Sequence, residues 1–403
     1  MLERLTRFLG VVSASAKHRT LVKHALKRFP EPPRHERDVL ALALKRHSAW
    51  SSMVGARMRT LLVDEPAMGR SQVRVSPVTT VGGLAELLGA SVMTLESLAD
   101  RRGLSRYAKT ERMRHHHVRL LPKKDGSLRV LEIPKDRLKD LQRRVLDRIL
   151  ASVPPHPAAF GFVRGRSALD YVRPHVGQAL VIRVDLRDFF SSIGAARVGG
   201  VFRAMGYPEE VRRTLTALTT VATPELFLRK LPWARRAVLR PPHLAQGAPT
   251  SPGLANLVAY GLDVRLSAFA KKVGATYGRY ADDLVLSGGS ELVRCRENLL
   301  ATMVKIAGDE GFEASEKKSR VRRSGEQQVL AGLVVNAHPA VPRKERELLE
   351  AILFNCVRHG PESQNRDERE DFRAWLEGRV AWVAHVCPRH GENLHALLQR
   401  IVW

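Results

Sequence analysis

Three aspartates at the ends of apolar segments constrain this sequence more than any other feature. Asp185 closes the apolar run VIRVD, and Asp282 and Asp283 lie in the turn of YADDLVLS. A carboxylate at the end of a buried strand is costly unless it is paired or binds a cation. Three such carboxylates on adjacent strand ends would form an oxygen-rich cage of the kind that Mg²⁺ prefers. The pattern therefore predicts paired strands with a metal-binding edge, although an Asp-Asp doublet alone is usually a solvated turn.

The charge of the chain indicates what such a metal site would act on. The sequence holds 67 Lys and Arg against 41 Asp and Glu, a net charge of +26. That surplus is well above the roughly 2–8 charges that keep a small domain soluble, so it favours a polyanionic partner. Nucleic acid is the first interpretation, and an anionic membrane surface or a merely solvated surface are the alternatives. With two Mg²⁺ ions about 3.5–4 Å apart, the predicted chemistry is phosphoryl transfer on a polynucleotide.

Composition narrows the class of protein and its compartment. At 403 residues and 44% hydrophobic content the chain is globular and long enough for up to three domains. No apolar run reaches the roughly 18 residues of a membrane span, so no membrane partner is expected. The three cysteines lie far apart without a CxxC pair. A disulfide framework and a zinc site are therefore not expected, and a cytoplasmic location fits.

The spacing of apolar residues along the chain predicts an α+β central region between helical ends. Residues 1–75 form a basic extension with two amphipathic helical segments, LVKHALKRF and DVLALALKRHSAW. Residues 76–115 contain two short helices that resemble a helix-turn-helix, which packing alone also explains. From residue 116 to 336 strands alternate with helices, beginning with a hairpin around Lys-Lys-Asp-Gly. Residues 337–403 are predicted to be helical throughout, so a helical appendage follows the mixed body.

Five sequence motifs occur in a fixed order along the chain. They are VDLRDFFSSI, QGAPTSPGLANL, YADDLVLS, GFEASEKKSRV and LAGLVVN. Their sequences and their order resemble the fingers and palm motifs of reverse transcriptases, and above all those of the bacterial branch of retrons and group II introns. The resemblance extends from about residue 116 to the end of the sequence. It implies a right-hand polymerase fold, with fingers and an antiparallel palm sheet over 116–336 and a helical thumb over 337–403.

This resemblance gives the acidic residues their expected roles. It implies two Mg²⁺ ions, with Mn²⁺ as a substitute, bound by Asp185, Leu186 through its carbonyl, Asp282 and Asp283. Tyr280 is expected to pack under the primer end. Lys318 matches the lysine that approaches the leaving pyrophosphate and protonates it, and the adjacent Lys317 is its rival.

Other motif residues are expected to bind the incoming deoxynucleotide. Phe190, five residues after Asp185, occupies the steric-gate position, where a bulky ring clashes with a ribose 2′-OH; simple core packing of Phe189 and Phe190 is the alternative. Gln246 and Gly247 resemble the loop beside the nucleotide. The triphosphate-binding fingers residues match Lys123 or Lys124 together with Arg129, for which a solvated hairpin tip is the alternative.

Weaker signals favour a retron within this superfamily. The chain stops soon after the expected thumb, and ALDYVRPHVGQALVIRVD resembles a retron insertion, with His175 matching its histidine. LAGLVVN lacks the threonine of the retron thumb-entry motif. A retron identity implies a structured non-coding RNA copied into RNA-linked single-stranded DNA (msDNA), and antiphage defence beside a toxic effector. The alternatives are another group II-intron-like reverse transcriptase and a maturase-derived RNA-binding scaffold.

The expected thumb offers local contacts for the primer and template. Because residues 337–403 hold as many acidic as basic residues, RNA recognition there would depend on shape and on individual side chains. The candidates are Arg343, Lys344, Arg373 and Arg379. Gly378 is expected to permit close packing of the helix that carries Arg373, and an ordinary amphipathic helix with a solvated face is the alternative.

Overall fold

A computed structural model describes residues 20, 23–24, 46–48, 66–108, 110–123 and 126–403. The helical segments expected in the basic extension lie almost wholly outside these residues. The chain divides into two compact units, residues 1–102 with 202–218 and residues 103–201 with 219–403.

The first unit contains the two short helices predicted from the sequence. Each begins at a side-chain cap, since Thr80 accepts a hydrogen bond from the Gly83 amide and Ser91 accepts one from the Thr94 amide. None of the helices in the described part of the chain is long and apolar enough to cross a membrane alone. The two short helices, Val81–Leu87 and Val92–Ala99, reach that length and apolar content only together, with a bend of 98° between them. Within residues 66–102 and 202–218, this unit contains α5 (Val81–Leu87), α6 (Val92–Ala99) and most of α10 (Glu209–Thr219).

The second unit begins with the predicted fingers hairpin. Its two strands pair in an antiparallel register from His116 opposite Pro134 to Pro122 opposite Leu128. Side chains alternate between two faces, so the face of Val130 packs on Leu228 and Leu231 while the other face stays open. The elements are β1 (His116–Pro122), β2 (Leu128–Pro134), α11 (Glu225–Leu228) and α12 (Trp233–Leu239).

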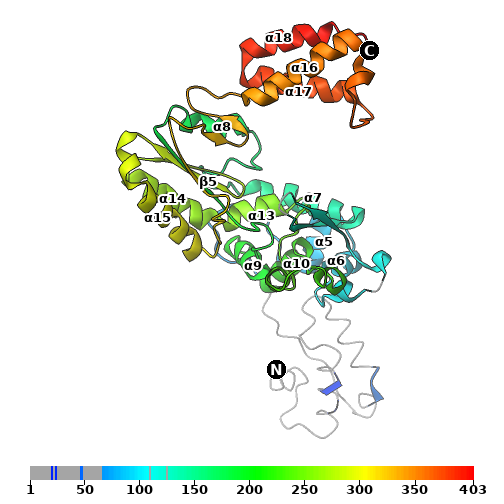
Figure 1. The fold of residues 1–403 in the computed structure, drawn as a ribbon. Helices are drawn as coiled ribbons and strands as arrows, with labels where there is room; N and C mark the ends of the chain where they lie inside the picture. The colour runs from blue at the N-terminus through cyan, green and yellow to red at the C-terminus, as the bar shows by residue number, and fades with distance from the viewer. Residues whose placement is uncertain (1–19, 21–22, 25–45, 49–65, 109, 124–125) are drawn as a thin grey trace. The chain divides into compact units, whose positions relative to one another are not determined.

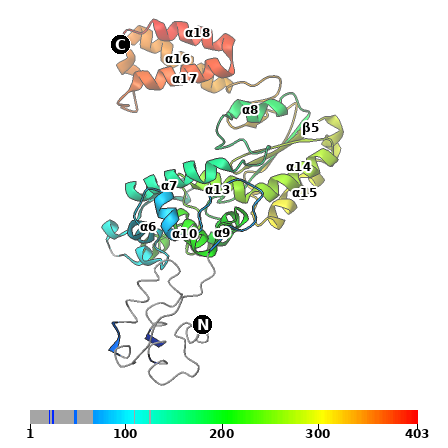
Figure 2. The same ribbon diagram turned by 180° about the vertical axis from the view of Figure 1, so that it is seen from behind.

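The palm is a four-stranded antiparallel sheet in the order β4-β5-β3-β6. The two central strands are almost continuously apolar because both faces are buried. Two helices pack on the sheet (Figure 1), and Val181 and Val285 join a core that includes Tyr171, Val172 and Leu330. The same helices stay against the sheet when the molecule is seen from behind (Figure 2). The elements are β3 (Leu180–Asp185), β4 (Thr276–Tyr280), β5 (Asp283–Gly288), β6 (Arg320–Arg323), α14 (Tyr260–Lys272) and α15 (Arg296–Asp309).

Two further helices connect the fingers to the palm. The amphipathic helix predicted after the hairpin is present, and it buries Leu138, Leu141 and Val145. This helix lies beside the one that carries Gly253 in both views (Figures 1 and 2). A Cβ added to Gly253 would touch the side chain of Leu146. These are α7 (Asp136–Arg148) and α13 (Ser251–Val258), with α8 (Ala168–Val172) and α9 (Ala195–Ala204) before and after β3.

The C-terminal residues form the predicted helical bundle after a short strand pair. Its middle helix buries Phe372, Leu376, Val380 and Val383 along one face, as their three-four spacing predicts. The elements are β7 (Val329–Leu330), β8 (Leu333–Val334), α16 (Arg343–His359), α17 (Phe372–Val386) and α18 (Pro388–Gln399).

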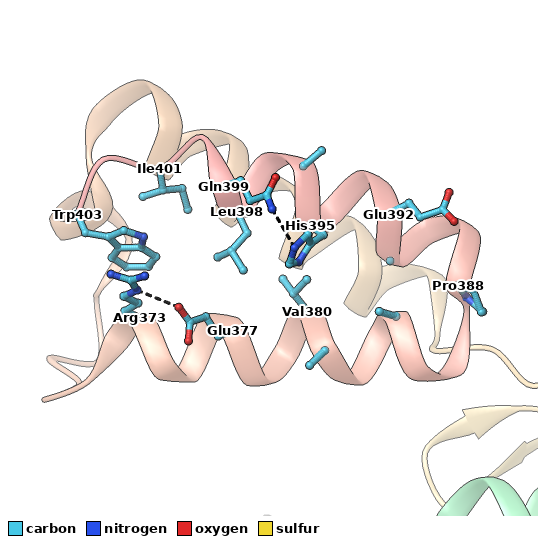
Figure 3. Close-up of a pocket in the computed structure, with 14 residues that line it drawn as sticks. Arg373, Glu377, Val380, Pro388, Glu392, His395, Leu398, Gln399, Ile401 and Trp403 are labelled. Carbon is cyan, nitrogen blue, oxygen red and sulfur yellow. Dashed lines mark hydrogen bonds and ion pairs between the residues drawn. The ribbon is translucent and has the colours of Figure 1, made fainter.

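The expected close approach at Gly378 is wrong. A Cβ added there would meet nothing within 4 Å, because Gly378 faces away from the neighbouring helices. The close contact lies instead at Gly391 on α18, where an added Cβ would overlap the Cα of Ala384 on α17. These two helices run along each other on either side of a groove (Figure 3).

Candidate active site

The strand register brings the predicted acidic residues to one edge of the palm sheet. Asp185 at the end of β3 lies opposite Asp283 at the start of β5, and Tyr280 on β4 lies opposite Asp283 on its other side. The amide of Leu186 donates to the carbonyl of Asp282 at 2.8 Å, which ties the end of β3 to the β4–β5 turn. The sequence could place each aspartate at a strand end, and the register joins them.

Each of the two buried carboxylates is held by a basic side chain. Asp185 and Asp283 are both 6% exposed. The Nζ of Lys318 lies 2.9 and 3.2 Å from the two carboxylate oxygens of Asp185. The Nε of Arg183 donates to Asp283 at 2.5 Å. Lys318 was predicted for the site, whereas Arg183 was missed; its position two residues before Asp185 on the same strand face was the available signal.

Burial and mutual repulsion disfavour the charged forms of the Asp-Asp pair. The pKa of Asp282 is raised, first by burial and then by the nearby carboxylate of Asp185. The pKa of Asp283 is raised to about 6, mainly by burial; Arg183 opposes this shift, and Asp282 and Asp185 add to it. An added cation would therefore be bound favourably here, because it would stabilise carboxylates that the fold leaves partly uncompensated.

The donor set fits a hard divalent cation, although the side chains are not gathered around one point. Across the described ranges, no group of three or more His, Cys, Asp or Glu side chains has the spacing of a metal site. Lys318 and Arg183 instead supply the positive charge next to Asp185 and Asp283. Carboxylate oxygens with a backbone carbonyl are the ligands that Mg²⁺ takes, so the residue types match the expectation for this edge.

A buried polar network supports the turn that carries the aspartates. Arg279 on β4 is fully buried and forms a two-pronged ion pair with Asp263 on α14, at 2.8 and 2.6 Å. The same guanidinium donates to the side chain of Asn256 and to the carbonyl of Ala281, at 2.9 and 3.1 Å. Tyr277 donates to Asp263 at 2.8 Å. Sequence reasoning missed this network, whose only signal was a set of polar residues inside apolar elements.

The two phenylalanines after Asp185 have different surroundings. Phe189 is 4% exposed and packs on Phe312 with ring centroids 5.6 Å apart, so it belongs to the core. Phe190 is half-buried and remains accessible on one side. This environment leaves Phe190, and not Phe189, able to contact a bound nucleotide.

The fingers residues line the open face of the β1–β2 hairpin. Arg129 is exposed on the same face as Ile133, and Gly247 lies so close to Ile133 that an added Cβ would be 3.2 Å from its side chain. The carbonyl of Gln246 accepts a hydrogen bond from the Glu132 amide at 2.9 Å, which joins the loop of Gln246 and Gly247 to the hairpin. The loop therefore meets β2 at Glu132 and Ile133, further along the strand than Arg129.

The remaining fingers residues are placed only in part. Lys123 lies at the end of β1, where its amide donates to the carbonyl of Ser127, and Lys124 lies outside the described residues. Arg119 is exposed opposite Leu131, on the face of Arg129, and the sequence reading missed it. Alternation along β1 could have identified it.

The predicted thumb residues are engaged in local ion pairs. Arg343 pairs with Glu347 at 2.6 Å, and Arg373 pairs with Glu377 at 2.9 Å. Arg373 also stacks on Trp403, with its guanidinium carbon 5.3 Å from the ring centroid, beside the groove in Figure 3. Arg379 lies 3.9 Å from Glu345, and Lys344 is exposed at the start of α16. These side chains form a surface of the bundle and do not belong to the sheet edge described above.

An antiparallel palm sheet with aspartates at one edge, a basic fingers hairpin and a helical thumb define a template-directed polymerase of the right-hand class. Residues 121–344 match the family described as reverse transcriptase (RNA-dependent DNA polymerase). The chain is 36% identical to the retron Mx65 reverse transcriptase of Myxococcus xanthus, over 93% of this chain and 83% of that protein. It is 34% identical to the retron Ec86 reverse transcriptase of Escherichia coli, over 62% of this chain and 70% of that protein.

The chain therefore belongs to the reverse transcriptase family, in its retron branch. It is an RNA-directed DNA polymerase that takes RNA as its template partner, and its family works with divalent metal ions. Telomerase from Candida albicans, solved with a fragment of telomeric RNA, aligns with 70% of this chain and 56% of that chain at 10% identity and a TM-score of 0.38, too low to add to the assignment.

Proposed function

We propose that this enzyme copies a dedicated, structured non-coding RNA into RNA-linked single-stranded DNA, the msDNA of a retron, from deoxynucleoside triphosphates. The complex would serve antiphage defence in the cytoplasm together with a toxic effector protein. The observation that supports the chemistry is the register of Asp185 opposite Asp283, with the Asp282 carbonyl bonded to Leu186. This register gathers acidic groups and a backbone carbonyl at one edge of the sheet.

The proposed roles follow from the position and chemistry of each side chain. Two Mg²⁺ ions would be held by Asp185, Asp282, Asp283 and the carbonyl of Leu186; when bound, they supply charge that activates the primer hydroxyl and stabilises the leaving oxygen. Lys318, already at the carboxylate of Asp185, would donate a proton from its Nζ to the departing pyrophosphate.

The nucleotide-binding roles use the open faces of the fingers and palm. Arg129 and Lys123 or Lys124 would bind the triphosphate, because guanidinium and ammonium groups neutralise phosphate oxygens. Phe190 would exclude a ribose 2′-OH, and the backbone of Gln246 and Gly247 would lie along the nucleotide. Tyr280 would support the primer end.

The C-terminal bundle is the proposed RNA-binding surface. Arg343, Lys344, Arg373 and Arg379 would contact the RNA stem by exchanging their present partners, such as Glu347 and Glu377, for phosphates. We propose that the chain has four parts: an extension over 1–75, a helical segment over 76–115, fingers and palm over 116–336, and a thumb over 337–403.

The test is DNA synthesis by the purified full-length chain on the structured transcript encoded beside its own gene. Labelled deoxynucleotides should enter a product that loses its RNA part on ribonuclease treatment and keeps a short residual oligonucleotide at one end. An unrelated RNA of equal length is the matched control and should give little product. Equal synthesis on both RNAs would contradict a dedicated template, and a free DNA end would contradict RNA-linked priming.

A further inference from the structure

One aromatic residue near the active site has a conformation that packing alone does not explain. Phe162 adopts a φ of +61°, in the left-handed region that bulky side chains avoid. Its side chain is also 56% exposed, so the ring gains little from burial. A strained backbone and an exposed large apolar ring are both unfavourable, and such residues cluster at functional sites.

The loop around Phe162 is fixed to the turn that carries the catalytic aspartates. The amide of Phe160 donates to the carbonyl of Arg279 at 2.8 Å, and the carbonyl of Gly161 accepts from the side chain of Asn256 at 2.9 Å. A Cβ on Gly161 would lie 2.5 Å from the backbone nitrogen of Ala281, so this stretch is in tight backbone contact with the turn. These contacts hold the two residues directly before Phe162 and so fix the chain where it enters the strained conformation.

The strained conformation directs the ring toward the sugar-gate residue. The centroids of the Phe162 and Phe190 rings lie 6.0 Å apart at 52°, within the range of favourable aromatic pairs. The ring of Phe190 also lies near that of Phe189, with centroids 5.6 Å apart. Phe190 thus has two aromatic neighbours, one in the core and one on a strained loop.

We propose that Phe162 is a specificity-determining residue, which holds the ring of Phe190 in the position that excludes a ribose 2′-OH. The inference rests on the proposed role of Phe190 as the gate. A half-buried phenylalanine with one aromatic neighbour can rotate about its side-chain torsions more freely than one that would lose a second aromatic contact by rotating. Phe162 itself acts through Phe190, so it is a positioning residue and its removal should relax sugar selection.

The test replaces Phe162 by glycine in the full-length enzyme with its RNA. Glycine adopts a positive φ without strain, so the melting temperature of Phe162→Gly should stay equal or rise. The ratio of kcat/KM for a deoxynucleotide over that for the matching ribonucleotide should fall about tenfold, equivalent to about 1.4 kcal/mol. Glu368→Gly is the matched control, because Glu368 is exposed with a φ of +49° in the C-terminal bundle. It should leave the ratio unchanged.

A double variant separates this inference from the gate itself. If Phe162 acts through Phe190, then Phe162→Gly with Phe190→Ala should relax selection no further than Phe190→Ala alone. An unchanged ratio in Phe162→Gly beside a lowered ratio in Phe190→Ala would overturn the inference and leave the polymerase function intact. A lowered melting temperature in Phe162→Gly, or additive effects in the double variant, would also overturn it. Absence of DNA synthesis by the unaltered enzyme would instead contradict the proposed function.

Discussion

Lys318 and Arg183 each bind one of the buried carboxylates, at 2.9 and 2.5 Å. Without bound cations, these two basic side chains offset the repulsion between the carboxylates and lower the free-energy cost of burying their charge. Lys318 is well exposed beyond this contact, with 64% of its side chain accessible. We therefore expect Lys318, and not Lys317, to leave Asp185, reach a leaving group and transfer the proton.

The first prediction concerns this choice between Lys318 and Lys317. Lys318→Ala should lower the rate of single-nucleotide incorporation by about 10²-fold, the scale of a lost general acid. Lys317→Ala is the matched control, since Lys317 is also exposed but forms no ion pair with Asp185 among the described residues. It should change the rate by less than about threefold in the same single-turnover assay. A large loss in the Lys317 variant alone would exchange the two roles.

The second prediction concerns the pH dependence of stability without divalent metal. The pKa of Asp283 is about 6 in the folded chain, above its ordinary value of 3.8, so ionised Asp283 disfavours folding above pH 6. This penalty fades as the pH falls through 6 and is absent below about 4. Asp283→Asn should therefore raise the free energy of unfolding by about 1–3 kcal/mol at pH 8 and leave it unchanged near pH 4.

Urea unfolding of both proteins at the two pH values measures this difference. Asp309→Asn serves as the control for the substitution itself, because Asp309 is an exposed partner of Arg265 and exposed ion pairs contribute little to stability. A stabilisation by Asp283→Asn that is equal at pH 8 and pH 4 would show that the charge of Asp283 is not its cause.

At the scale of elements, the β4–β5 turn depends on the buried pair of Arg279 and Asp263. The third prediction is that Arg279→Met lowers the free energy of unfolding by about 3–5 kcal/mol, because it leaves the Asp263 carboxylate buried and unpaired. Combining it with Asp263→Leu should recover most of that loss. Arg265→Met, on the helix that carries Asp263, is the exposed control and should change stability little, because exposed ion pairs contribute little. Similar losses for Arg279→Met and Arg265→Met, measured in urea, would contradict the account.

The fourth prediction compares two glycines of the C-terminal bundle. Gly391→Ala should lower the free energy of unfolding by about 1–3 kcal/mol, because its Cβ would overlap Ala384 on the facing helix. Gly378→Ala should raise it by about 0.5–1 kcal/mol, since alanine restricts the unfolded chain and nothing lies within 4 Å of the new methyl group. Thermal melting of both variants is sufficient, and an opposite order would refute the packing described here.

The same two glycines show where sequence reasoning stopped. Periodicity predicts α17 and its buried face correctly, because a 3.6-residue repeat is local information. Which glycine meets another helix depends on how the helices cross, and no local pattern encodes that. The ion pair of Arg279 and Asp263 is similar: the residues are 16 positions apart on a strand and a helix, and only the packed fold joins them. The aspartates could be predicted because each lies in a short motif of consecutive residues, VIRVD for Asp185 and YADDLVLS for Asp282 and Asp283.

For the whole molecule, the net charge of +26 agrees with an RNA partner but does not locate it. The thumb arginines are already paired with glutamates of their own bundle, so their attraction for RNA is offset in part. Non-specific attraction should then come from the rest of the chain, and selectivity for one RNA from the shape of the bundle. This division agrees with the equal numbers of acidic and basic residues in 337–403.

The fifth prediction, and the most direct test of the central claim, separates DNA synthesis from RNA binding in one protein. The full-length chain and its Asp282→Asn/Asp283→Asn variant are compared for deoxynucleotide incorporation and for affinity toward the cognate RNA. Asparagine keeps the size of each side chain and removes the charge that would hold the metal ions, whereas RNA is bound by basic groups and shape. The account predicts that synthesis falls by at least about 10³-fold while the Kd for RNA changes by less than about threefold. Substantial synthesis by the double variant would contradict it.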